Sequence, residues 1–110
     1  MAIVNADVST ADTTLLTVPA SKKYALTTLL VCNTGTDDGT GGNDSVFDCH
    51  IVPSGQSKTD TNLILNNLEV AAADTFTFAT ERLILEEGDR VILVGAAPAN
   101  LVATLSYLEV

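Results

Sequence analysis

Few side chains could do chemistry, and their spacing fits no familiar catalytic site. His50 is the only histidine, so a Ser-His-Asp triad or a zinc site would need partners from distant parts of the chain. No G-x-S-x-G elbow marks a serine nucleophile, and Cys32, Cys49 and His50 lack the spacing of zinc ligands. We therefore expect no enzyme activity, no catalytic or metal-binding residue and no cofactor, and we interpret His50 as a surface or interface histidine.

Two acidic segments come closest to a functional site. The segment GTDDGTGGND at 35–44 holds carboxylates and flexible glycines, which calcium prefers, but it does not follow the EF-hand pattern. The segment EEGD at 86–89 offers adjacent carboxylates, whereas acid–base catalysis needs a cleft that perturbs one of them. The sequence favours a polar loop at 35–44 and a tight turn at 86–89.

The net charge of the chain limits the kinds of partner that it can bind. The 110 residues include 14 acidic and 5 basic ones, for a formal net charge of −9. Such a surface repels phosphate, so we expect no direct contact with nucleic acid or with an anionic membrane. Residues 1–14 lack the features of a signal peptide, and we expect a protein made in a cytoplasm, with Cys32 and Cys49 reduced and facing the core.

The elements that must position these residues are strands. Period-two patterns recur at short spacing and turn signals separate them, whereas no convincing amphipathic helix is present. The predicted strands are 15–18, 24–34, 45–52, 62–70, 75–79, 82–85, 90–94 and 101–110. This pattern predicts one all-β domain of about seven to eight antiparallel strands, a β-sandwich or jelly roll, over residues 13–110.

The strand at 24–34 is apolar on both sides. Leu26 and Leu30 alternate on one face, while Leu29 and Val31 make the other face apolar too. We expect the second face to be covered by a neighbouring subunit. The segment 1–12 has scattered apolar residues and is predicted as an N-terminal arm that orders against a neighbour or, alternatively, as a frayed terminus.

Two long stretches resemble small virion proteins of tailed phages, including marine and cyanobacterial ones. They are TTLLTVPASKKYALTTLLVCNTGT at 13–36 and FATERLILEEGDRVILVGAAPANLVATLSYLEV at 78–110, the second with the pattern L-x-L-x-x-G-D and the ending SYLE. The resemblance implies a compact β-sandwich that assembles on a particle, often as a trimer. Such proteins are head decoration (cement) proteins in some phages and belong to the tail, baseplate or fibres in others.

From the resemblance we expect a non-enzymatic structural subunit of the virion, with a capsid decoration (cement) protein that stabilises the head as a trimer preferred. Its expected partners are itself, as a homotrimer, and a major capsid protein or another virion protein. The alternatives are a tail, baseplate or fibre protein, and a carbohydrate- or receptor-binding module. The residues expected at the interface are Ile3 and Val4 of the arm and Leu29 and Val31 of the outer strand face.

Overall fold

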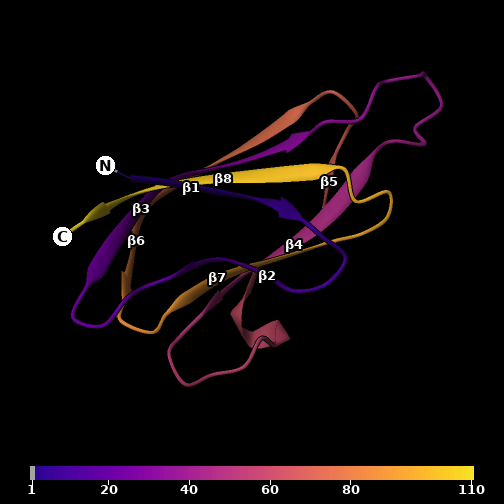
Figure 1. The fold of residues 1–110 in the computed structure, drawn as a ribbon. Helices are drawn as coiled ribbons and strands as arrows, with labels where there is room; N and C mark the ends of the chain where they lie inside the picture. The colour runs from indigo at the N-terminus through magenta and orange to yellow at the C-terminus, as the bar shows by residue number, and fades with distance from the viewer. Residues whose placement is uncertain (1) are drawn as a thin grey trace.

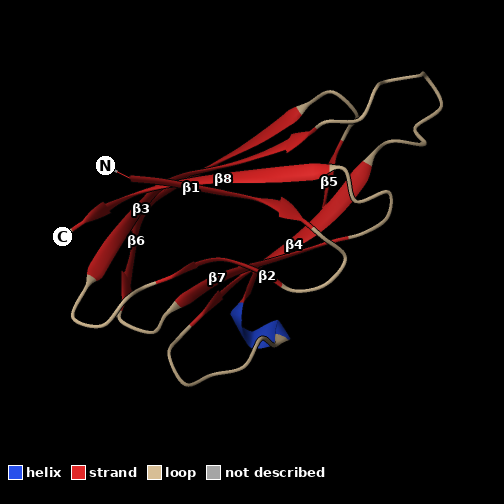
Figure 2. Ribbon diagram, in the orientation of Figure 1, coloured by secondary structure: helices blue, strands red, loops and turns tan. Residues whose placement is uncertain are grey.

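Eight antiparallel strands form two facing sheets (Figures 1 and 2). The computed structural model describes residues 2–110, except for the side chains of residues 80–82. The strands are β1 (Ala2–Val8), β2 (Thr13–Thr17), β3 (Lys23–Asn33), β4 (Ser45–Val52), β5 (Leu63–Val70), β6 (Thr75–Glu86), β7 (Arg90–Gly95) and β8 (Leu101–Glu109). A single 3-10 turn, η1 (Asp60–Asn62), precedes β5. The predicted all-β sandwich is confirmed.

The strand pairing is nested along the chain. One sheet, which we call the terminal sheet, has the order β1-β8-β3-β6, and the second sheet has the order β2-β7-β4-β5. The first strand pairs with the eighth, the second with the seventh, the third with the sixth and the fourth with the fifth. The chain therefore folds as one long hairpin that is rolled into two layers.

The core lies between the two sheets. Alternate residues of β8 point into it, and Leu101, Ala103 and Leu105 are buried there as their spacing predicts. Phe76 and Phe78 of β6 are partly buried and pack against the same cluster. Complete burial of one such large side chain contributes about 1.5–3 kcal/mol, so this cluster dominates the stability of the sandwich.

A β-bulge in β3 changes which of its residues face the core, so the faces predicted for that strand were wrong. The pairing of β3 with both neighbours shifts between Leu26 and Thr28, and the Thr27 hydroxyl donates to the Ser106 carbonyl at 3.0 Å. Because the bulge adds a residue, Leu26 and Leu29 both point into the core although they are three positions apart.

Leu29 and Val31 therefore cannot form the outer interface that their positions predicted. Leu29 is 1% exposed and Val31 is 0% exposed within the single chain. Leu30 and Cys32 point outward instead, so the prediction that Cys32 faces the core is also wrong, while Cys49 is buried as predicted.

The N-terminal segment differs from the predicted arm. Residues 2–8 form β1 at the edge of the terminal sheet, and every one of them pairs with β8, from Ala2 opposite Tyr107 to Val8 opposite Leu101. The order of this segment thus comes from the chain's own sheet. Val4 packs against the core, whereas Ile3 points outward and is 66% exposed.

The remaining difference concerns β6. Two short strands were predicted at 75–79 and 82–85, but the chain forms one strand, Thr75–Glu86, that pairs with β3 on both sides of the bulge. The loop at 35–44 is confirmed, and Figure 1 shows it projecting from one end of the sandwich, away from the two termini.

Candidate functional site

His50 is buried under a loop and has a structural role. Its Nδ1 lies 2.9 Å from Asn62 Oδ1, and the same oxygen accepts from the Thr59 amide at 3.1 Å. The Asn62 amide nitrogen donates to the Ser57 carbonyl at 2.9 Å, so the oxygen is the acceptor and His50 Nδ1 carries the proton. At 4% exposure His50 is not the surface or interface histidine that was predicted, because the loop 53–62 folds over it.

The carboxylates of the acidic loop at 35–44 accept hydrogen bonds at separate places, two within the loop and one from a distant residue. Asp38 accepts from the amide and the hydroxyl of Thr40, and these bonds lower the pKa of its carboxyl below the usual value. Asp37 accepts from the Gly39 amide at 3.0 Å, and Asp44 accepts from the Ala72 amide at 2.9 Å. Among the described residues no three acidic, histidine or cysteine side chains gather as metal ligands.

The segment 86–89 forms the tight turn that was predicted. Asp89 accepts from the Glu86 amide through one carboxylate oxygen and from the Ser54 amide through the other, each at 2.8 Å. Gly88 has a φ of 83°, in the left-handed region that favours glycine. The carboxylate of Asp89 therefore ties two loops together, which is a structural task.

The two cysteines are free and lie in different environments. Cys49 is buried in the core, and burial raises the pKa of its thiol from 9.0 to about 12. Cys32 is half-buried on the outer face of the terminal sheet. The Cys49 thiol is therefore a poor nucleophile at neutral pH.

Alkaline destabilisation should depend on Cys49. The folded chain keeps this thiol protonated while the unfolded chain loses the proton above about pH 9, so its contribution to stability is complete below pH 9 and falls as pH rises towards 12. We expect a loss on the order of 3 kcal/mol by about pH 11. Urea unfolding of the wild type and of Cys49→Ala measures it; equal pH slopes for the two proteins would contradict the prediction.

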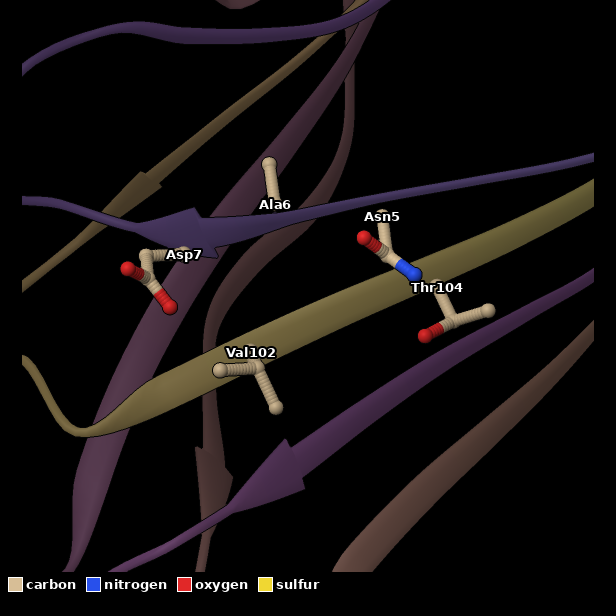
Figure 3. Close-up of a pocket in the computed structure, with 5 residues that line it drawn as sticks. All are labelled: Asn5, Ala6, Asp7, Val102 and Thr104. Carbon is tan, nitrogen blue, oxygen red and sulfur yellow. The ribbon is translucent and has the colours of Figure 1, made fainter.

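A small surface hollow lies on β1 and β8. Asn5, Ala6, Asp7, Val102 and Thr104 line it, and Figure 3 shows Asn5 beside Thr104 and Asp7 beside Val102. The hollow offers one carboxylate, one amide and one hydroxyl from its lining. It belongs to a much larger surface, the outward side of the terminal sheet.

We define this surface, the terminal-sheet face, by the outward-pointing residues of its four strands. They are Ile3, Asn5 and Asp7 of β1, Val102, Thr104, Ser106 and Leu108 of β8, Lys23, Ala25, Thr28, Leu30 and Cys32 of β3, and Thr75, Thr77, Ala79, Ile84 and Glu86 of β6. The charged members of this set are Asp7, Lys23 and Glu86, and Lys23 pairs with Glu86 at 3.6 Å. The middle of the set consists of aliphatic, threonine, serine and alanine side chains.

Most of the exposed large apolar side chains lie on this surface. Of the six such residues in the described part of the chain, the face holds Ile3, Leu30, Ile84 and Leu108, and Val110 follows directly at the end of β8. The sixth, Ile64, lies on β5 of the second sheet. An apolar surface of this kind marks a site of protein association more often than a solvated face.

The outer side of the second sheet is partly covered by the chain itself. The loop 53–62, which includes η1, lies over this side (Figure 2), and His50, Val52 and Ile92 are buried there. Arg90, beside Val52 in the sheet, donates to the Gln56 carbonyl of the same loop. No segment of the described chain covers the terminal-sheet face in the same way.

The sequence pattern pointed to an apolar outer face on 24–34 but assigned it to the wrong residues. Of the four residues predicted at the interface, Ile3 alone lies on the terminal-sheet face, whereas Val4, Leu29 and Val31 point inward. The adjacent Thr27 and Thr28 were the available signal, since two polar residues in a row interrupt the alternation of a strand where a bulge is present.

Neither the family models nor the curated proteins that were searched include a match to this chain. Within residues 2–110 the structure has no helix with the length and apolar character needed to cross a bilayer.

Proposed function

We propose that this chain is a non-enzymatic structural subunit of a phage particle, preferably a decoration protein that stabilises the head as a homotrimer. The observation that carries the proposal is the terminal-sheet face, whose residues with described side chains include few charged ones, on a chain with a net charge of −9. A subunit that works by assembly needs such a surface, because burial of apolar area drives association.

The strand order also supports the proposal. Nested pairing of eight strands in two sheets is the arrangement of a jelly roll, and we infer that the chain has this fold. Jelly rolls are common in viral capsid proteins and occur in lectins and cupins as well. Fold alone does not assign function, so the surface and not the topology decides between these classes.

The residues that could have served catalysis are engaged in structural bonds. His50 holds the loop 53–62, Asp89 joins two turns, and the Cys49 thiol is kept protonated in the core. An acid–base or nucleophilic mechanism needs such groups in a cleft beside a substrate. This arrangement favours a subunit over an enzyme.

A carbohydrate-binding module is supported less well. Such modules usually present aromatic rings on an outer surface, but all five aromatic residues of this chain belong to or pack against the core. The rings of Tyr24 and Tyr107 are tilted against each other, with their centroids 4.5 Å apart. A tail, baseplate or fibre role uses the same kind of surface and remains the alternative location.

Immunogold electron microscopy of particles from the source of this chain tests the proposal. Antiserum raised against the purified protein should label the head at many positions, while pre-immune serum should not. Label confined to the tail would establish the alternative location and exclude head decoration. Particles that carry no label, and in which mass spectrometry detects no peptide of this chain, would contradict the proposal as a whole.

A further inference from the structure

We propose that the terminal-sheet face is the surface through which copies of this chain bind one another, packed around the symmetry axis of a closed oligomer. The occupant of the face is thus a second copy of the same chain. This inference rests on the proposed function only for the number of copies. The chemistry, charge and size of the terminal-sheet face support its role in self-association.

The chemistry of the face suits packing against another sheet. Leu30 lies at its centre, with Thr104 of β8 and Thr77 of β6 directly beside it in the register. The next row has Val102, Cys32 and Thr75 side by side. Aliphatic and β-branched side chains in rows are what pack between two sheets about 10 Å apart.

The distribution of charge favours a second copy as the occupant. Identical side chains meet at a symmetry axis, so any unpaired charge there faces a charge of the same sign. Among the residues of the face whose side chains the structure describes, the charged ones, Asp7 and the Lys23–Glu86 pair, avoid this because they lie at opposite ends of the strands. Elsewhere on a surface with a net charge of −9, two copies would bring carboxylates together.

The area of the terminal-sheet face can be compared with the area that one partner buries in a protein–protein contact. Four strands are roughly 19 Å wide and nine residues are roughly 30 Å long, which gives a flat area of roughly 570 Å² before side-chain relief is counted. A specific interface buries about 800 Å² per partner, and the smaller ones bury under about 600 Å². The flat area of one face therefore matches the smaller contacts, and side-chain relief adds to the area that one copy can bury.

A matched pair of variants tests the inference in the intact chain. Leu30→Asp places a carboxylate at the centre of the face, and Ile64→Asp places one on β5 of the second sheet. The two residues are equally accessible, 38% and 40% exposed, so the changes cost the single chain similar amounts. Light scattering should show that Leu30→Asp is monomeric and that Ile64→Asp keeps the mass of the wild type. Thr77→Glu, on the edge strand β6, is the second face variant if Leu30→Asp lacks the circular dichroism spectrum of a folded β protein.

Cys32 provides a second readout that needs no mutation of its own. It lies on the face, whereas Cys49 is fully buried with its thiol pKa raised to about 12, so a thiol reagent near neutral pH reports on Cys32 alone. We expect the reagent to modify Cys32 about tenfold faster in the Leu30→Asp monomer than in the wild-type oligomer, because the oligomer covers the face.

The outcomes separate this inference from the proposed function. Loss of the oligomer in Leu30→Asp but not in Ile64→Asp, with faster modification of Cys32, supports the inference. An oligomer that survives both face variants, with Cys32 modified equally fast in all proteins, overturns it and leaves the particle role intact, since immunogold labelling tests that role separately. A wild type that is monomeric with a freely reactive Cys32 also overturns it.

Discussion

Replacing Leu29 with aspartate is expected to unfold the chain. Leu29 is 1% exposed and belongs to the core cluster between the two sheets, so the new carboxylate would have to be buried without a partner or would force the strand out of the sheet. Either costs several kcal/mol, which is comparable with the whole stability of a domain of this size. Circular dichroism and a urea unfolding curve measure the effect.

The neighbouring variant Leu30→Asp is the control for this prediction. Leu30 is one position away in the same strand but points outward, so its variant should keep the β-sheet spectrum and a clear unfolding transition. The opposite result, a folded Leu29→Asp and an unfolded Leu30→Asp, would show that the bulge at Thr27 and Thr28 is absent and that β3 keeps a regular alternation.

The second large effect is expected for Asn33→Ala. The Asn33 side chain is almost fully buried, and its amide nitrogen donates to the carbonyls of Asn43 and Val70 at 2.8 and 2.9 Å. Its side-chain oxygen accepts from the Gly35 amide at 2.8 Å. Three bonds at about 1 kcal/mol each, one of them to a buried carbonyl, predict a loss of about 3 kcal/mol in the free energy of unfolding.

The loop 35–44 should respond to the same change. Asn33 holds the loop at both of its ends, so Asn33→Ala should let a protease cut there at concentrations that leave the wild type intact. Asn66→Ala is the control, since Asn66 is exposed on β5 and its removal should leave both the unfolding curve and the protease pattern unchanged. A variant at Asn33 that matches this control would rule out the anchoring role.

Local patterns in the sequence predicted much of the fold. The bounds of β4 at Ser45–Val52 and the inward face of β8 follow from strict alternation, because each residue's side is fixed by its own strand. The polar loop at 35–44 follows from its glycines and aspartates, which suit turns and not strands.

The predictions differed from the structure where contacts between distant parts of the chain decide which way a residue points or whether it is buried. The side of the sheet to which Leu29 points depends on a bulge that is stabilised by Ser106 of β8. The burial of His50 depends on a loop that folds back over the sheet. The order of β1 depends on a strand that lies about a hundred positions later in the chain. Of these three features only the bulge leaves a mark in a short window of sequence, the adjacent Thr27 and Thr28, and the candidate site was misplaced because the alternation was continued through it.

The molar mass of the purified wild-type chain, measured by light scattering near neutral pH and at moderate salt, tests the central claim most directly. The claim is that the chain assembles with itself through the terminal-sheet face. It predicts a closed trimer of about 34.5 kDa, three times the 11.5 kDa of one chain, that persists on dilution into the low micromolar range. A stable 11.5 kDa monomer across the same concentrations would contradict it.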